Sequence, residues 1–230
     1  MKVILNFLPR CGGGGLQNIL SFIRVLGADM PAEDKKQYIA LTRRGSDMDL
    51  ACREAGLDVM DIPNHYRSRM KFELGCLKRF SRGQVCFTFW GPPMLWSKGY
   101  LTNVIGCALS NLYYPEIDFW GPSSFLQRHK ARLRDIYRWY MVKRADYWIF
   151  ETETLAHRAV RLAGFPEERV GVVRMTPSIL VGPDKVVPEQ KQELEKSLPK
   201  KFRLLMLCGG AANKRQHALP YIAREMVQRG

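Results

Sequence analysis

The segment "VILNFLPRCGGGGLQNIL" (residues 3–20) decides the fold of this chain. Its first part, 3–8, is a continuous apolar run, which is typical of a strand buried on both faces of a parallel sheet. Four glycines follow, and after them apolar residues recur at helical spacing until Gly27, where we expect the helix to end. A glycine turn in this position indicates either a loop that binds an anion or a flexible turn that lets strand and helix pack closely.

Strand and helix signals keep alternating along the chain. Strands are predicted at 38–42 and 57–62, and the helix between them has a capping-box-like Ser-x-x-Asp at Ser46 and a terminating Gly56. Further strands are predicted at 85–90, 147–150 and 170–173, helices at 126–144 and 154–163, and an apolar run at 101–110. Such alternation requires right-handed crossovers, so the predicted fold class is α/β, with a Rossmann-like doubly wound parallel sheet.

The character of the sequence changes after residue 181. Residues 182–201 contain three prolines around a charged run, which is typical of a linker. Residues 202–230 then repeat the opening pattern, with a buried strand, a short glycine turn and a helix from Leu219. We therefore predict a first domain at 1–181, a linker at 182–201 and an incomplete second α/β unit at 202–230.

Composition narrows the classes of partner. Lys plus Arg outnumber Asp plus Glu by 36 to 22, a net charge of +14, which favours phosphate-bearing partners: nucleotides, nucleic acids or an anionic membrane surface. The six cysteines form no Cys-x-x-Cys pair, which argues against structural zinc and disulfide-rich scaffolds and favours reduced thiols in a cytosol. The N-terminal apolar run lacks a signal-peptide cleavage site, and no run of eighteen apolar residues occurs.

Four stretches carry a resemblance to a known family: the opening segment, "CALSNLYYPEIDFW" (107–120), "KRADYWIFETETLAHRAVRLAGFPEERVGVVRMTP" (143–177) and "FRLLMLCGGAANKRQHALPYIAREM" (202–226). They resemble, in order, the first strand and glycine loop, a cleft-facing loop, the end of the first domain and the start of the donor domain of family 4 glycosyltransferases. These enzymes have the GT-B fold, and the likeness is closest to members that build bacterial surface polysaccharides such as O-antigens.

The resemblance implies a hexosyltransferase-like enzyme that moves a sugar from a nucleotide-sugar donor to a growing, lipid-linked cell-surface glycan. It further implies a metal-independent mechanism without a cofactor, usually retaining, in a cytoplasmic protein peripheral on the inner face of the membrane, as in lipopolysaccharide synthesis. The chain matches only the front part of such an enzyme, and the Glu-x7-Glu element of the donor domain has no counterpart in it. We therefore expect the 230 residues alone to be poor at transfer.

The candidate site residues follow from the same stretches, while no catalytic residue is assigned and no metal site is expected. The candidates for substrate binding are Gly13, Gly14, Gly15, Asn18, Asn111, Tyr113, Glu116, Thr152 and Glu153. Lys214 and Gly210 are the candidates for donor phosphate, although Gly209 stands where the family commonly has an arginine. Simpler roles stay open: a Tyr-Tyr-Pro turn that only packs, a helix cap at Thr154, and an ordinary exposed lysine at 214.

Two basic segments, 65–82 and 126–144, explain much of the net charge. Each has aromatic residues among its arginines and lysines, and the second has an apolar stripe, which suits contact with anionic lipid headgroups. Plain solvated surface and nucleic acid are the other interpretations of these segments. The alternative functions are thus a non-catalytic module that binds glycan or membrane headgroups, or a nucleic-acid-binding α/β protein, for which no recognition motif is present.

Overall fold

The computed structural model describes residues 2–9, 11–63, 71–75, 77–121, 123–174 and 219–229. The strands are β1 (Val3–Asn6), β2 (Tyr38–Arg43), β3 (Asp58–Ile62), β4 (Val85–Thr88), β5 (Thr102–Cys107), β6 (Tyr147–Phe150) and β7 (Val170–Val172). The helices are α1 (Gly14–Asp29), α2 (Ala32–Lys35), α3 (Asp47–Glu54), α5 (Phe125–Val142), α6 (Glu153–Ala163) and α8 (Leu219–Arg229). Short 3-10 helices are η1 (Leu77–Arg79), η2 (Ser110–Leu112) and η3 (Glu167–Arg169).

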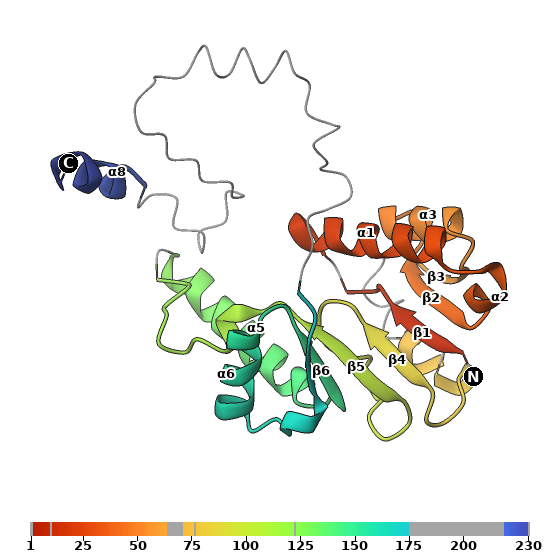
Figure 1. Cartoon of the computed structure of the whole chain (residues 1–230). Helices are drawn as coiled ribbons and strands as arrows, with labels where there is room; N and C mark the ends of the chain where they lie inside the picture. Colours follow the sequence, from red (N-terminus) through yellow and green to blue (C-terminus); the bar gives the residue numbers. More distant parts are fainter. Residues whose placement is uncertain are drawn as a thin grey trace, which may run out of the picture. The chain divides into compact units, whose positions relative to one another are not determined.

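All seven strands form one parallel sheet in the order β3-β2-β1-β4-β5-β6-β7 (Figure 1). The chain first builds outward from β1 through β2 to β3, and then returns to place β4 on the other side of β1. The strand order therefore reverses between β1 and β4, which is the point where open α/β sheets bind ligands. The predicted fold class, a Rossmann-like parallel α/β sheet, is confirmed.

The continuous apolar run of β1 reflects burial on both faces of the sheet. Leu5 and Phe7 pack with α1 and α3 in one cluster, whereas Ile4 and Leu8 pack on the opposite face. Because side chains alternate along a strand, both faces need apolar residues and no polar alternation remains in the sequence. Asn6 is the exception, and its buried side chain bonds to groups of the same sheet edge.

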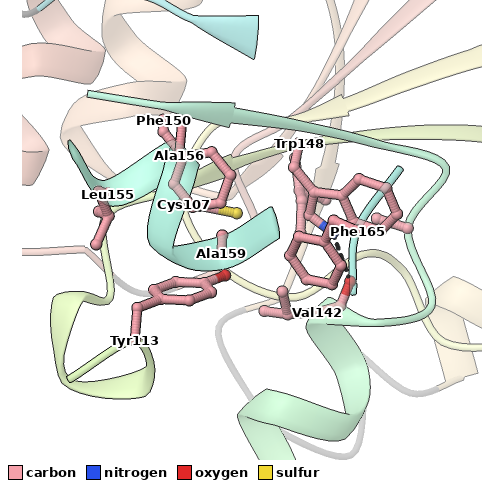
Figure 2. Close-up of a cluster of buried hydrophobic side chains, with 11 residues drawn as sticks. Cys107, Tyr113, Val142, Trp148, Phe150, Leu155, Ala156, Ala159 and Phe165 are labelled. Carbon is pink, nitrogen blue, oxygen red and sulfur yellow. Dashed lines mark hydrogen bonds between the residues drawn. The ribbon is translucent and has the colours of Figure 1, made fainter. Parts of the chain in front are cut away.

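A further cluster covers β5 and β6 on the face opposite α1 and α3. Ile105 and Trp148 lie on this face, together with apolar side chains of α6. Figure 2 shows the indole of Trp148 beside Phe165, and its Nε1 donates to the carbonyl oxygen of Val142 at 2.9 Å. Helices thus cover both faces, as a doubly wound sheet requires.

Two helix ends are those that the sequence predicted, and one differs. Ser46 caps α3, and Gly164 ends α6 with a left-handed φ of 68°. The prediction that Gly27 ends the first helix is wrong, because α1 continues to Asp29. Gly27 is needed for packing instead: a Cβ there would lie 2.7 Å from the Cβ of Ala55.

The chain divides into two compact units. The first comprises 1–115 and 134–178 and contains the whole sheet, and the second comprises 116–133 and 179–230. The predicted linker at 182–201 and strand at 202–207 lie outside the described residues, so the predicted domain bounds stay predictions. Within the described ranges, no helix combines the length and the apolar character that crossing a bilayer requires.

Candidate functional site

The glycine loop lies at the reversal of strand order, between the end of β1 and the start of α1. Gly12, Gly13 and Gly14 are exposed, and Gly15 is half-buried. Gly13 has φ 58° and ψ −136°, a backbone conformation that only glycine adopts without strain. The loop therefore turns at Gly13 and starts α1 with its first amide groups facing solvent.

The four positions differ in whether the structure requires glycine there. A Cβ at Gly15 would lie 2.6 Å from the Sγ of Cys11 and 3.4 Å from the indole of Trp90, so this glycine allows close packing. A Cβ at Gly12 or Gly14 would meet nothing within 4 Å, and neither has a positive φ. Neither packing nor backbone geometry explains those two, and the open space above them is what a ligand close to the backbone requires.

The start of α1 has no capping group of its own. Its N-cap is Gly13, no described side chain accepts a hydrogen bond there, and the first turn contains no acidic residue. The first amide groups of a helix lack partners within the helix, and the helix dipole adds partial positive charge at this end. Amide groups and a dipole in this arrangement favour an anion, and here they lie at the strand-order reversal.

Beneath the loop, β1 and β4 are joined by a buried polar contact. The Nδ2 of Asn6 donates to the Oγ1 of Thr88 at 3.0 Å, and its Oδ1 accepts from the backbone N–H of Leu8. Because both side chains are buried and bonded, they hold the two strand ends together and are not available to a ligand.

Trp90 follows β4 and fills the space between the glycine loop and β5. Its indole contacts Gly15 on one side and Gly106 on the other, where an added Cβ would lie 3.0 Å from Cε3. The Nε1 of Trp90 is buried and has no hydrogen-bond partner among the described residues. A buried donor without an acceptor is costly, so this N–H is a group that a ligand or water would satisfy.

Two more polar groups lack partners at the carboxyl ends of the next strands. The Nδ2 of Asn111, after β5, is buried without an acceptor in the described part of the chain. The carboxylate of Glu151, directly after β6, is half-buried, and no hydrogen bond or ion pair engages it within the described ranges. Burial raises the pKa of Glu151 above its usual value.

Trp90 and Glu151 were not among the residues that the sequence singled out. Their shared signal is position, since Trp90 lies two residues past β4 and Glu151 one residue past β6. The carboxyl ends of neighbouring parallel strands meet at one edge of the sheet. Polar residues directly after each predicted strand could therefore have been collected as one set with the glycine loop.

Thr152 and Glu153 lie at the same edge, but both side chains are engaged. The Oγ1 of Thr152 accepts from the backbone N–H of Leu155 at 3.3 Å, so Thr152 is the N-cap of α6. The sequence had suggested Thr154 for this cap, which is wrong because Thr154 lies inside the helix. The exposed carboxylate of Glu153 pairs with Arg174 at 2.8 Å, which lowers the pKa of Glu153.

Tyr113 lies in the core instead of on the surface. Its side chain is fully buried in the cluster that Figure 2 shows. It packs edge-on against Trp139 and Phe150. Its hydroxyl interacts with the thiol of Cys107, and burial raises the pKa of both groups, that of Cys107 to about 12. This placement agrees with the simpler interpretation, a Tyr-Tyr-Pro turn that packs, and leaves no face of Tyr113 for a sugar.

The remaining candidates are scattered. Asn18 is half-buried on α1, close to the glycine loop in sequence, whereas Glu116 is exposed and belongs to the second compact unit. Lys214 and Gly210 lie outside the described residues. No group of three or more His, Cys, Asp or Glu side chains gathers as metal ligands within the described ranges.

The two basic segments differ in where their apolar residues point. In 65–82, residues 65–70 and 76 lie outside the described part, while Phe80 is buried in the core and Phe72 packs against it. The aromatic side chains described there face inward, and the exposed residues include charges such as Lys78 and Arg79 and one large apolar side chain, Leu74. In α5 the predicted apolar stripe is exposed.

No protein-family model matches the chain, and no curated protein matches it at a significant level. Among solved structures it is similar to HepE of Anabaena in complex with UDP-glucose, with 12% sequence identity and a TM-score of 0.46. The match covers 85% of this chain and 50% of that one, so the chain spans about half the length of HepE. A likeness this distant carries no conclusion about the activity of this chain.

Proposed function

We propose that this chain is the acceptor-side part of a glycosyltransferase that uses a nucleotide-sugar donor. One observation carries the proposal: the glycine-lined, uncapped start of α1 lies where the strand order of the sheet reverses. The sequence resemblance to family 4 glycosyltransferases supports it independently. In such an enzyme the loop of Gly12 to Gly15 would bind an oxyanion of the donor diphosphate or of the acceptor.

Sugar transfer from a nucleotide sugar needs stabilisation of a leaving diphosphate. Backbone N–H groups and a helix dipole supply this without proton transfer and without a metal ion, because they are oriented before the reaction begins. The net charge of +14 would also attract a negatively charged donor. The proposed mechanism is therefore electrostatic and metal-independent, with the start of α1 as the contribution of this chain.

The groups without partners on the adjacent strand ends would bind the sugar itself. The indole N–H of Trp90 and the amide of Asn111 are donors, and the carboxylate of Glu151 is an acceptor. Sugar hydroxyls both donate and accept hydrogen bonds, so a mixed set of this kind suits them. Asn18, Thr152 and Glu153 would line the same edge, with Thr152 contributing through the cap that it forms.

The finer parts of the proposal come from the resemblance. Lys214 and Gly210 would contact the donor phosphate, and Glu116 the acceptor. The acceptor would be a growing, lipid-linked glycan of the cell surface, of the O-antigen type, and the protein would work on the inner face of the cytoplasmic membrane. The structure of HepE, to which this chain is similar, contains UDP-glucose. UDP-glucose is therefore a practical first ligand to test.

Calorimetric titration of the chain with UDP-glucose, GDP-mannose and inorganic diphosphate tests the proposal. Gly14 offers a clean pair of variants, because a side chain there meets nothing within 4 Å. Gly14→Asp places a carboxylate in the first turn of α1 and should weaken binding at least about tenfold by charge repulsion. Gly14→Ala is the matched control: it fills the same space without adding charge, so it should weaken binding less than Gly14→Asp does. The proposal fails if no nucleotide sugar binds, or if both variants bind equally well.

A non-catalytic headgroup-binding module is the second candidate, favoured by the exposed apolar stripe on α5. It predicts that the chain binds lipid vesicles or glycan but none of the nucleotide sugars. A titration in which a nucleotide sugar binds at the start of α1 would exclude this candidate.

A further inference from the structure

Helix α5 exposes a row of large apolar side chains. Phe125 is 84% exposed, Leu126 62%, Leu133 57%, Ile136 65% and Tyr140 60%. Single exposed apolar residues are common on protein surfaces, but several on one helix are a distinct feature that marks a binding surface. We name the outward side of α5, defined by these five residues, the α5 stripe.

The five residues lie on one side of the helix. Counted from Leu126, the other positions are 133, 136 and 140, which an α-helix brings to the same face, and Phe125 lies at its margin. The opposite side faces the protein interior, where Ala131 and Val142 are buried. The helix therefore has two apolar sides. The inner side packs against the rest of the protein, and the outer side is exposed.

Positive charge borders the α5 stripe. At 3.6 residues per turn, exposed Lys130 lies along one margin, and exposed Arg132 and Lys143 lie along the other. The only acidic residue of α5 is Asp135, which lies toward the interior side and pairs with Arg138 at 3.4 Å. No negative charge of this helix opposes an anionic partner on the stripe.

We propose that the α5 stripe docks on an anionic lipid bilayer, with its apolar side chains in the headgroup region and its basic margins on lipid phosphates. Helices that lie in a membrane interface have this arrangement, an apolar face with Lys and Arg beside it. The phenol of Tyr140 suits the same boundary because it is apolar in its ring and polar at its hydroxyl.

Charge complementarity selects the lipid over other occupants. A second copy of this chain would bring basic margins against basic margins, which is unfavourable. Nucleic acid would match the charge, but its bases stack on aromatic side chains, whereas Leu126, Leu133 and Ile136 of the stripe are aliphatic. An anionic bilayer supplies both the negative charge and the apolar layer.

This inference goes beyond the proposed transferase, because α5 would dock whether or not the start of α1 binds a nucleotide sugar. For an acceptor-side domain, docking would hold the sheet edge near lipid-linked glycan and raise the local concentration of such an acceptor. Of the two basic segments, α5 carries the apolar row, whereas 65–82 exposes charges and a single large apolar side chain, Leu74, within its described residues.

Vesicle co-sedimentation of the whole chain tests the proposal. We expect binding to vesicles of phosphatidylglycerol with phosphatidylcholine, no binding to phosphatidylcholine alone, and weaker binding at high salt. The double variant Leu133→Glu, Ile136→Glu should bind anionic vesicles at least about tenfold more weakly, because it puts carboxylates on the apolar face. Its matched control is Leu50→Glu on α3, where Leu50 is 54% exposed outside the stripe and the change should leave binding intact.

A second variant, Lys130→Gln with Arg132→Gln, removes margin charge without touching the apolar row and should weaken binding severalfold. Circular dichroism and calorimetric titration with UDP-glucose, run on the same samples, separate loss of docking from loss of folding or of nucleotide binding. Three results would overturn the proposal: no anionic vesicle binds, the Leu133/Ile136 variant binds like the wild type, or that variant converts a dimer in solution to a monomer.

Discussion

Helices α1 and α6 both begin at the carboxyl edge of the sheet, and they begin in opposite ways. α6 has Thr152 as its N-cap and Glu153 in its first turn, and α3 likewise has Ser46 and two acidic residues. α1 starts at Gly13, with no capping side chain among the described residues and no acid in its first turn. In α3 and α6 a side chain of the chain itself satisfies the helix start, whereas in α1 no described side chain does so.

The polar side chains beside these helix starts differ in the same way. Around α3, Asp49 accepts from Thr42 and from the backbone N–H of Gly45, and it also pairs with Arg53. Near α1, by contrast, the indole N–H of Trp90 has no hydrogen-bond partner in the part of the chain that the structure describes. Polar groups that bind each other stabilise the fold, and those without partners are the ones that a ligand can use.

The largest expected effect comes from Gly13→Ala, which forces a side chain into the conformation that turns the loop into α1. We expect the free energy of unfolding to fall by about 1–3 kcal/mol, the usual cost of such strain. Urea denaturation measures it, with Gly14→Ala as the control, because Gly14 has no positive φ and open space around it. Equal unfolding free energies for the two variants would show that the loop does not need glycine at 13.

Removing a helix cap should lower the free energy of unfolding by less than Gly13→Ala does. Thr152→Ala deletes the acceptor for the backbone N–H of Leu155, and Ser46→Ala deletes the one for Asp49. Each change should lower the free energy of unfolding by about 1 kcal/mol. Thermal unfolding checks both variants. An unchanged melting temperature would mean that these helix starts do not depend on their caps.

The free energy of unfolding should increase when the start of α1 is made to resemble the start of α6. Gly14→Asp adds an acid to the first turn of α1, which should stabilise the protein by about 0.3–1 kcal/mol through the helix dipole. The same variant is expected to lose ligand, so stability and binding should move in opposite directions. A variant that is less stable than Gly14→Ala would contradict an unsatisfied helix start.

The smallest expected effects are on the pH dependence of stability. They have opposite signs for Glu151, after β6, and Asp61, in β3. Burial raises the pKa of Glu151, so the folded state holds its proton more tightly than the unfolded state does. The stability that this group adds at low pH is therefore lost as pH rises through its folded pKa. We expect Glu151→Gln to gain stability relative to the wild type as pH increases through that window.

Asp61 should behave in the reverse sense. Hydrogen bonds from Arg44 and Arg53 lower its pKa, so its stabilising contribution is present above the ordinary carboxyl pKa and is lost as pH falls. Asp61→Asn should therefore be destabilised near neutral pH and match the wild type in acid. Unfolding curves across the acidic range check both carboxyls, and parallel profiles for the two variants would contradict this assignment.

The sheet could be predicted from the sequence because each strand needs apolar residues on both faces, and helix ends carry local signals such as Ser46 and Gly164. What local signals cannot show is which neighbour a side chain meets. Gly27 stands at the end of the helical pattern but serves packing against Ala55, and for Tyr113 the sequence left sugar binding and packing both open, whereas its side chain lies in the core. These outcomes depend on contacts between distant segments.

The candidate site was predictable in part for the same reason. The glycine loop is local, and the structure places it at the reversal of strand order. The apolar stripe of α5 was predicted, but periodicity alone could not tell that its outer residues remain exposed, because a core-facing stripe has the same spacing. Trp90 and Glu151 were missed because their lack of partners appears only when the strands lie side by side.

The central claim, that the start of α1 is left unsatisfied in order to bind an anion, is tested most directly by NMR. Backbone amide resonances of the chain would be followed during titration with UDP-glucose and with inorganic diphosphate. The account predicts that inorganic diphosphate shifts Gly14, Gly15 and Leu16 but not the capped starts of α3 and α6, and that UDP-glucose shifts the same three residues. Equal shifts at all three helix starts, or no shift at Gly14 to Leu16 at saturating ligand, would contradict it.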